Sequence, residues 1–563
     1  MTDNGMELSA VDKTPLKIIP LGGLGEIGLN MMAIEYGDAI IVIDCGLMFP
    51  EDYMLGIDIV IPDVSYLKRN REKVKAFIIT HGHEDHTGAL PFVLRDLNVP
   101  IYATALTLGL IEEKLLEFDL VRSTTFETVR PRDRVVIGPF DIEFIRVSHS
   151  IVDGCGLAIR TPLGVIVHTG DFKMDQTPVD GEVMDYARFS AYGEAGVLAF
   201  MSDSTNVEKE GYTLSEREIG YNLEEIFRKC EGRIIVAAFS SNIHRVQQVL
   251  DAADKFGRKV ALNGKSMVAN VKIARTLGYL KAPEGLMVDL KEIESLPPQR
   301  LVLLTTGSQG EPMSALTRMA MDNHKQIKVM KGDTVILSSK FIPGHEKAIT
   351  TMMNHLYRRG ADVIYEKVSE VHVSGHASQE ELKIMLNIVK PKYFIPVHGE
   401  YRHLVLHSRL AAKVGIPEEN IIIAEDGDVV EFTDKGVRKN GKVEYGRVFV
   451  DGKGVGDVGE MVLKDRSHLS QDGLVLAVVA INAATGEIVY GPEIMTRGLM
   501  FEEEATHLLE DARNVVLDTL NNIAVEAKTE QLEVKEEIRR ALRRYFNKKL
   551  ERRPVILPVI IEI

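Results

Sequence analysis

His81, His83, Asp85 and His86 lie within six residues of one another, directly after the apolar run Ala76–Ile79. A short apolar run bounded by polar residues predicts a buried strand, so these side chains follow that strand at its carboxyl end. Imidazole nitrogen and carboxylate oxygen are ligands for zinc and similar divalent ions. On extended chain His81 and His83 point to the same side and can bind one ion, which leaves the last two side chains for a second. The motif therefore predicts a fold with a metal site at the end of a strand.

The same arrangement recurs along the chain: a short apolar run, followed by a residue of a metal-binding type. Five further residues follow such runs, namely Asp44, His149, Asp171, Asp203 and His398. The runs are Ile40–Asp44, Phe144–Ser148, Val165–Thr169, Val197–Met201 and Tyr393–Val397. Side chains at the carboxyl ends of neighbouring strands meet at one edge of a sheet. We therefore expect one site, built along one sheet edge.

Composition excludes several classes of protein. At 563 residues the chain exceeds one hydrophobic core, so about three or four domains are expected. Its three cysteines are isolated, which argues against a disulfide framework and against thiolate metal ligands and fits a reducing cytoplasm. The longest apolar run, Leu474–Ile481, is too short to cross a bilayer, so no membrane partner is expected. With a formal charge of −15, a nucleic-acid partner needs a local basic channel.

The order of apolar patterns predicts the domains. From residue 216 strands alternate with helices, near 243–256 and 346–359 for example, as in an α/β unit with a parallel sheet. This unit interrupts the first domain, because His398 must return to the site begun at His81. The predicted boundaries are 1–215 and 377–447 for the two parts of the first domain, 216–376 for the insert, 448–461 for a glycine-rich linker and 462–563 for a C-terminal domain. That last domain is expected to be α+β, with strands at 474–481, near 488 and at 555–563, and helices near 502–525 and 529–550.

Two glycine-rich segments are interpreted as structural. Gly23-x-Gly25-x-x-Gly28 matches the letters of a dinucleotide fingerprint, which needs a helix directly after the glycines to hold a pyrophosphate. Here Leu29–Glu35, a turn at Tyr36–Asp38 and Ala39–Ile43 follow instead, which is the pattern of a hairpin. Gly307–Gly310 is expected to be a strand–helix turn rather than a phosphate cradle.

The motifs together resemble a known family. The histidine-rich motif, His149, Asp171 and His398 are similar to the metallo-β-lactamase superfamily. Three later segments resemble its β-CASP nuclease branch, and the nearest resemblance is to bacterial ribonuclease J: Asp203–Asn206, Ser374–Ser378 and Pro396–Glu400. The resemblance covers nearly the whole chain. It implies an α/β fold: a metallo-β-lactamase αββα sandwich interrupted by an α/β β-CASP domain, plus a small C-terminal α+β domain.

The resemblance also implies two divalent metal ions, with zinc as the first choice and manganese as the alternative. The implied ligands are His81, His83 and His149 for one ion, Asp85, His86 and His398 for the other, and Asp171 for both. Asp44 would support them by hydrogen bonding. Asp85, His376 and Asp203 are the implied catalytic residues: Asp85 orients or deprotonates the attacking water, and His376 stabilises the phosphorus centre or protonates the leaving 3′-oxygen.

A pocket for a 5′-phosphate is implied as well. Its residues are His372, Ser374, Gly375, His376, Ala377 and Ser378, with Ser240 and Ser241 from the insert. Hydroxyls and backbone N–H groups make such a segment a suitable nest for phosphate. Two alternatives stay open: Ser240 and Ser241 as a helix N-cap before Ile243, and His372 as an ordinary strand residue.

By this resemblance the chain is a ribonuclease acting on single-stranded RNA, 5′→3′ as an exonuclease and also as an endonuclease, in mRNA decay and rRNA maturation. A homodimer or homotetramer formed through the C-terminal domain, and other RNA-decay proteins as partners, are implied too. His398 favours RNA over DNA, because DNA-processing members of the branch usually carry an apolar residue there. The alternatives are a nuclease for DNA, a small-molecule metallo-hydrolase, which the insert argues against, and a metal-free subunit of a decay complex, which the intact ligand set argues against.

The remaining histidines and a basic segment receive plainer interpretations. His168 is expected to pack inside its strand. The basic residues of the last helix, among them Arg540, Arg543 and Arg544, are either a solvated surface or an RNA contact.

Overall fold

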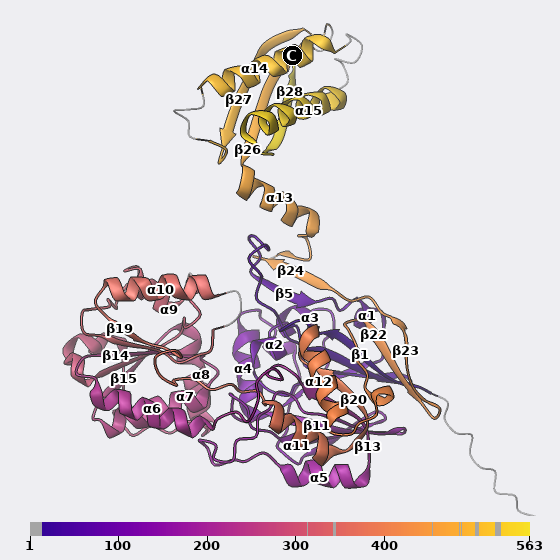
Figure 1. Cartoon of the computed structure of the whole chain (residues 1–563), viewed down its shortest axis with the longest axis vertical. Helices are drawn as coiled ribbons and strands as arrows, with labels where there is room; N and C mark the ends of the chain where they lie inside the picture. Colours follow the sequence, from indigo (N-terminus) through magenta and orange to yellow (C-terminus); the bar gives the residue numbers. More distant parts are fainter. Residues whose placement is uncertain are drawn as a thin grey trace, which may run out of the picture. The chain divides into compact units, whose positions relative to one another are not determined.

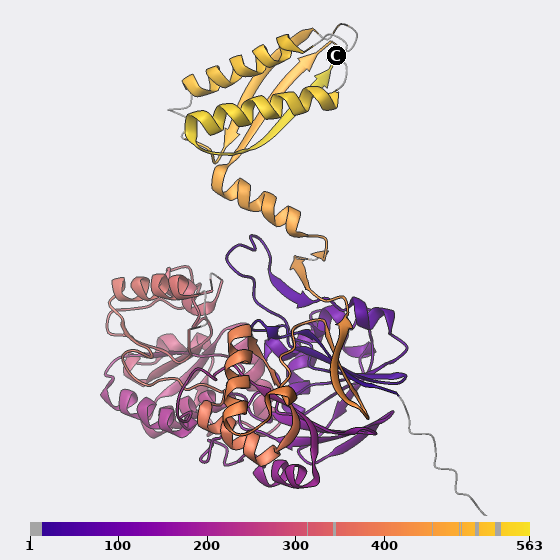
Figure 2. The same ribbon diagram turned by 45° about the vertical axis from the view of Figure 1, so that its right-hand side comes forward.

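The structure is a computed structural model, and it describes residues 14–311, 313–341, 345–452, 454–482, 485, 487–500, 506–523 and 531–563. The chain divides into two compact units (Figures 1 and 2). The larger unit comprises Ile59–Val448 and the segment that ends at Phe49, and the smaller one comprises Pro50–Asp58 and Phe449–Ile563. Each is described by itself.

Two sheets packed face to face form the centre of the larger unit. One contains β1 (Leu16–Gly22), β3 (Met31–Tyr36), β4 (Ala39–Ile43), β6 (Val74–Ile78), β7 (Ile101–Ala103), β8 (Phe126–Thr128), β22 (Asp428–Thr433) and β23 (Gly436–Lys442), in the order β23-β22-β1-β3-β4-β6-β7-β8. The other contains β9 (Arg134–Ile137), β10 (Phe140–Arg146), β11 (Cys155–Thr161), β12 (Gly164–His168), β13 (Val197–Asp203) and β20 (Pro391–Val397), in the order β20-β13-β12-β11-β10-β9.

Apolar side chains from both sheets meet in one core. Ile41 and Ile78 of the first sheet share a buried cluster with Phe144, Ile166 and Met201 of the second. Alternate residues of the second sheet, such as Ile145 and Phe200, point to its outer face and pack against helices. These helices are α5 (Tyr186–Ala195), α11 (Gln379–Val389) and α12 (Tyr401–Lys413). The other sheet is accompanied by α1 (Ser65–Arg69), α2 (Glu84–Thr87), α3 (Leu90–Val93) and α4 (Ala105–Leu116). The predicted αββα sandwich is therefore present.

The expectation of one site along one sheet edge is wrong in one respect. The strands before the predicted ligands belong to both sheets: β4 and β6 to the first, and β10, β12, β13 and β20 to the second. Within each sheet these strands run in the same direction, because β4 pairs with β6, β12 with β13, and β13 with β20 in parallel. The site therefore lies at one end of a two-sheet sandwich. A single-sequence pattern gives strand ends but not which sheet a strand joins.

The insert is a separate α/β layer structure, on the left of Figure 1. Its strands are β14 (Ile234–Ala237), β15 (Lys259–Asn263), β16 (Met287–Val288), β17 (Leu301–Thr305), β18 (Thr334–Leu337) and β19 (Asp362–Ile364), all paired in parallel in the order β16-β15-β17-β14-β18-β19. Ile234 and Val236 face a cluster that contains α6 (Glu216–Lys229), α7 (Ile243–Lys255) and α8 (Lys265–Thr276), whereas Ile235 and Ala237 face α9 (Ala315–Ala320) and α10 (Glu346–Arg358). A strand that is buried on both faces has a continuous apolar sequence, and the central strands of this sheet have such sequences.

A buried ion pair joins the start of the insert to its first βα unit. The Arg245 guanidinium on α7 is fully buried and donates to Glu216 Oε2 at 2.8 Å and to the carbonyl of Val371 at 2.6 Å. Lys173, which follows β12, lies 3.5 Å from the other oxygen of Glu216. Because a buried carboxylate is costly without partners, these cations stabilise the insert against the sandwich.

The chain takes the predicted course at both glycine-rich segments. After Gly28 the chain forms the antiparallel pair β3 and β4, with no helix to hold a pyrophosphate. Gly307–Gly310 lies between β17 and α9, and Gly310 N donates to Gly307 O.

The smaller unit contains a three-stranded sheet with two helices on one face. Its elements are β24 (Arg447–Asp451), β25 (Gly454–Val455), α13 (Glu460–Asp472), β26 (Leu474–Ile481), β27 (Ile488–Arg497), α14 (Thr506–Asn522), α15 (Gln531–Leu550) and β28 (Val555–Glu562). The predicted linker 448–461 is wrong, since strands and the start of α13 occupy its described part. Helix α13 was not expected because it is mostly polar, with Leu463 as its buried residue. The predicted helix ends 502–505, 524–525 and 529–530 lie outside the described residues.

Candidate metal centre

The predicted ligands converge at one end of the sandwich. Two groups of side chains bring their ligand atoms within 4.8 Å of one another: His81, His83, His149 and Asp171, and Asp85, His86, Asp171 and His398. They come from the ends of β6, β10, β12 and β20 and from α2. His398 lies in the left-handed backbone region, with φ 56°, and so does Asp44, with φ 60°. This conformation is uncommon outside glycine and is found where a side chain is held for function.

Three imidazoles face one another in the first ligand set. His83 Nδ1 lies 3.1 Å from His81 Nε2 and 3.2 Å from His149 Nε2. Asp171 Oδ2 lies 3.7 Å from the first of these Nε2 atoms and 3.8 Å from the second. A tetrahedral site with three nitrogens and one oxygen is a common arrangement for zinc.

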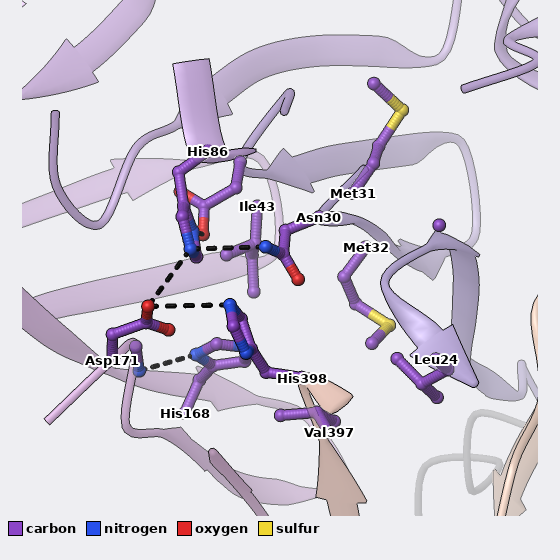
Figure 3. A pocket seen from close by; sticks show the side chains of 13 residues that line it. Leu24, Asn30, Met31, Met32, Ile43, His86, His168, Asp171, Val397 and His398 are labelled. Atoms are coloured by element: carbon purple, nitrogen blue, oxygen red, sulfur yellow. Dashed lines mark hydrogen bonds and ion pairs between the residues drawn. The ribbon is translucent and has the colours of Figure 1, made fainter. Parts of the chain in front are cut away.

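The second ligand set shares Asp171 with the first (Figure 3). Asp171 Oδ2 lies 3.3 Å from His86 Nε2 and 3.4 Å from His398 Nε2. Asp85 Oδ2 lies 3.6 Å and 3.4 Å from the same two nitrogens. Although His398 Nε2 is buried, it makes no hydrogen bond.

Neighbouring groups orient the rings from outside. His149 Nδ1 donates to the carbonyl of Gly375 at 2.7 Å, and His86 Nδ1 donates to Asp44 Oδ2 at 2.7 Å. His398 Nδ1 faces Thr205 Oγ1 at 2.6 Å. With Nδ1 engaged in this way, the Nε2 of each ring faces Asp171, and its lone pair can bind a metal ion when the ring is neutral. Lone pairs that converge on carboxylate oxygens repel one another unless a cation lies between them, so the donor set fits a divalent ion.

The two ligand sets differ in charge. Burial lowers the pKa of His81 and His149 and lowers that of His83 to about 4, so these rings are neutral near pH 7. Burial also opposes charge on His398, yet Asp171 and Asp85 raise its pKa to about 9. The second set thus lies in a strongly negative environment, which favours a positive ion at the same place.

A histidine–carboxylate pair adjoins both sets. His376 Nδ1 lies 2.7 Å from Asp203 Oδ2 and 3.9 Å from Asp171 Oδ2. The Asp203 side chain is 1% exposed and that of His376 is 21% exposed, so the ring is the part of the pair that a substrate can reach. Burial opposes charge on the ring, but Asp203 raises the pKa of His376 above its ordinary value.

The residues predicted to bind phosphate differ in their burial and in the hydrogen bonds that they already form. Ser374 Oγ accepts from the backbone N–H of His376 at 3.1 Å, and the carbonyl of Gly375 is engaged by His149. Ser378 is fully buried, caps α11 and forms hydrogen bonds with Asn206 and Thr213. Ala377 belongs to the apolar cluster on the outer face of the six-stranded sheet of the sandwich.

The alternative role of Ser240 and Ser241 as the N-cap of α7 is wrong. The cap is Asn242, whose side chain accepts from Arg245 N, whereas Ser240 Oγ accepts from Asn270 at 3.2 Å. His372 is partly buried, and desolvation together with Arg245 lowers its pKa to about 3. The neutral form of His372 is thus the one present near pH 7.

Sequence reasoning missed two polar residues that contact the ligands. Thr205 Oγ1 donates to Asp203 Oδ1 at 2.7 Å and lies beside His398, so it connects a candidate ligand to the histidine–carboxylate pair. Asn30 Nδ2 lies 3.2 Å from His86 Nε2. The position of Asn30, seven residues after the first glycine of the Gly23-x-Gly25-x-x-Gly28 segment, was the available signal. His168 is buried at the end of β12 as expected, and its Nδ1 accepts from Gly170 N at 2.9 Å.

Four family models match the chain. They are "Ribonuclease J, beta-CASP domain" over residues 231–356, "Ribonuclease J C-terminal domain" over 461–563, "Zn-dependent metallo-hydrolase RNA specificity domain" over 360–423 and "Metallo-beta-lactamase superfamily" over 24–206. Among curated proteins, ribonuclease J of Thermus thermophilus is 45% identical over 97% of this chain and 95% of that protein. Ribonuclease J2 of Bacillus subtilis is 42% identical over 97% and 99%.

The chain belongs to the ribonuclease J family. The predicted resemblance and the predicted combination of metallo-β-lactamase, β-CASP and C-terminal domains are thereby confirmed. A solved structure from Enterococcus faecalis V583, described as a protein of unknown function, aligns with a TM-score of 0.53 at 16% identity. The alignment covers 74% of this ribonuclease J family chain and all of the chain from Enterococcus faecalis. At this identity it shows a similarity of fold alone. Within the described residues, no helix has the length and apolar character needed to cross a membrane.

Proposed function

We propose that this chain hydrolyses phosphodiester bonds of single-stranded RNA with two divalent ions, zinc or alternatively manganese. It acts 5′→3′ as an exonuclease that prefers 5′-monophosphate ends and also as an endonuclease, in mRNA decay and rRNA maturation in the cytoplasm. One observation carries the proposal. Asp171 Oδ2 lies 3.3–3.8 Å from ring nitrogens of both ligand sets, beside the pair His376 and Asp203.

The chemistry divides between the bound ions and the chain. Two divalent ions held by these ligands would supply the Lewis acidity that activates a water and neutralises a phosphodiester. Asp85, whose carboxylate is 32% exposed and whose pKa is lowered by His86 and His398 against the effect of burial, remains ionised and orients the attacking water. His376 is held through Nδ1 by Asp203, which leaves its Nε2 to donate a proton to the leaving 3′-oxygen or to stabilise the phosphate.

RNA is the proposed substrate for two reasons. The relatives are named ribonuclease J, and residues 360–423 match a family model described as an RNA specificity domain. His398, in the third of the β-CASP segments, agrees with that choice. DNA is the alternative substrate. A small-molecule substrate is disfavoured, because the insert covers a large part of the chain without contributing a ligand to either set.

The 5′-monophosphate preference is assigned to the segment before α11. Backbone and hydroxyl groups of His372–Ala377, with Ser240 and Ser241 of the insert, are the proposed phosphate contacts. The hydroxyl of Ser378 is left out of this pocket because it already forms the helix cap.

Cleavage of end-labelled RNA tests the proposal. Matched strands carrying a 5′-monophosphate or a 5′-triphosphate, and a DNA strand of the same sequence, are digested by the wild type and by His81→Ala. We expect faster decay of the monophosphate form, little decay of DNA, and loss of activity in the variant and after chelation. His468→Ala, at an exposed position on α13, is the matched control and keeps wild-type rates.

Each outcome tests a different part of the proposed function. Equal rates for the two 5′ ends contradict the pocket, and equal rates on DNA contradict the RNA assignment. Wild-type rates for His81→Ala or for chelated protein contradict the metal-dependent mechanism as a whole.

We further propose a homodimer or homotetramer formed through the smaller unit. The sheet face opposite α14 and α15 carries Leu557, Val559 and Ile561, which are 45%, 40% and 46% exposed. Apolar side chains in a row on one sheet face favour burial against another chain. Light scattering of the wild type and of a Val559→Lys variant tests this, with a shift toward monomer as the expected result.

A further inference from the structure

The glycine-rich segment Gly22–Asn30, here called the glycine loop, runs between two parts of the second ligand set. On one side its β2 (Leu24–Gly25) pairs in parallel with β21 (Gly399–Glu400), directly after His398. On the other side Asn30 N donates to the carbonyl of Asp85 at 3.1 Å. The loop therefore contacts both chain segments that must come together to form this set.

The side chain of Asn30 reinforces the second contact. Its Nδ2 donates to the carbonyl of Asp85 at 3.0 Å and lies 3.4 Å from Asp85 Oδ2 and 3.2 Å from His86 Nε2. Asn30 is 9% exposed, and Figure 3 shows it beside His86, with His398 across a cavity of about 20 Å³. An amide held by a carbonyl and buried in so small a space keeps one orientation, and so do the groups that it contacts.

Glycine is required for this close approach. Gly23 has φ +90°, and a Cβ there would lie 2.4 Å from Asn30 Oδ1. At Gly22 a Cβ would lie 2.2 Å from the carbonyl of Leu29. The letters of a nucleotide fingerprint therefore serve a different purpose here, which is to let backbone pack against the metal centre.

Among the described residues, the glycine loop forms hydrogen bonds with residues of the second ligand set and not with the histidines of the first. Within this part of the chain, hydrogen bonds of the loop reach Asp85, His86 and Gly399, and none reaches His81, His83 or His149. Its partners outside both sets include Gly46, Leu47, Asp426 and Arg447. Those three rings are fixed by Thr80, by Gly375 and by one another.

We propose that the glycine loop positions the ligands of the second ion, with Asn30 as its main positioning residue, and so sets the affinity for that ion alone. This rests on the proposed two-ion function. Loss of a group that orients a metal ligand typically costs about 10–100-fold in metal affinity. Loss of Asn30 is expected to weaken binding of the second ion by that factor and to leave the first within about twofold.

The test is a metal titration of the full chain. Chelator-stripped wild type, Asn30→Ala and Gly23→Ala are titrated with Zn²⁺ by calorimetry, and bound zinc is counted by elemental analysis. Ile27→Ala, at a 38% exposed position of the same loop, is the matched control. The expected result is two ions in the wild type and control, but a second ion held about 10–100-fold more weakly in both variants. Melting temperatures of the stripped variants are expected to fall, because Asn30→Ala removes a hydrogen bond of a buried side chain and Gly23→Ala adds a close contact. The deciding readout is therefore the ratio of the two zinc affinities, since a merely structural role would weaken both ions alike.

Three results overturn the proposal. Wild-type affinity for both ions in Asn30→Ala, or equal weakening of both, contradicts selective positioning and leaves the proposed function intact. Fewer than two ions in the wild type contradicts the two-ion function, and the role of the loop with it.

Discussion

Gly375→Ala is the variant whose effect follows most directly from the structure. A Cβ at this position would lie 2.6 Å from His149 Cε1 and 2.7 Å from its Nδ1, whereas ordinary contacts begin at 3.4 Å. The segment and the ring must therefore separate by about 0.8 Å. The same movement lengthens the 2.7 Å hydrogen bond from His149 Nδ1 to the carbonyl of Gly375, which holds the ring toward the metal site.

The cost is estimated from two effects. Poorer orientation of a metal ligand lowers metal affinity about 10–100-fold, and displacement of a catalytic group by nearly 1 Å costs about 100-fold in rate. Both apply, because Gly375 directly precedes His376. We expect single-turnover RNA cleavage at saturating metal to fall about 100-fold in Gly375→Ala. Ser374→Ala, which removes a hydroxyl without adding a Cβ clash, serves as the comparison and is expected to lose less. Wild-type zinc affinity together with a wild-type rate in Gly375→Ala would refute this reasoning.

Three further predictions concern stability and RNA binding. Arg245→Met leaves the buried Glu216 carboxylate with one cation fewer and should lower the free energy of unfolding by about 3–5 kcal/mol, measured by urea denaturation. An unchanged free energy of unfolding would contradict this prediction. Burial, with Glu26 nearby, raises the pKa of Asp426 to about 8. Between about pH 4 and 8 the unfolded chain then binds fewer protons at this group than the folded chain does, so the free energy of unfolding falls as pH rises. In Asp426→Asn the free energy of unfolding should depend less on pH over that range. An unchanged pH profile would exclude Asp426 as the cause. Three α15 arginines are exposed, and one of them, Arg540, lies 2.9 Å from Glu537 of the same helix, as expected of a solvated surface. Replacing the three by Ala should leave the salt dependence of RNA binding unchanged; a slope reduced by about one per residue would indicate phosphate contacts. The three arginines are Arg540, Arg543 and Arg544.

The sequence predicted the sandwich strands that precede the candidate ligands, because each is a short apolar run bounded by polar residues. For the insert it predicted the alternation of strands and helices. It also predicted β26 with the observed bounds, Leu474–Ile481. It failed for α13, whose exposed polar sequence has no apolar face from which to infer a helix. It failed as well to assign strands to sheets, since pairing depends on contacts between residues distant in sequence.

Prediction of the site had the same limits. Candidate ligands can be recognised by residue type, so the convergence of His81, His149 and His398 with carboxylates was predictable without structural knowledge. Asn30 and Thr205 were not, because amides and hydroxyls are common and their value here arises from neighbours far along the chain. Ser378 illustrates the converse: its place in a phosphate-binding motif suggested a ligand contact, but its hydroxyl caps a helix.

The order of the ligands along the chain has a consequence for biosynthesis. The first set is complete once translation has passed Asp171, whereas the second awaits His398, which emerges only after the entire insert. Under the proposed function, a growing polypeptide therefore lacks a ligand of the second ion until the insert has been synthesised. Binding of both ions would then mark a chain whose insert is already present.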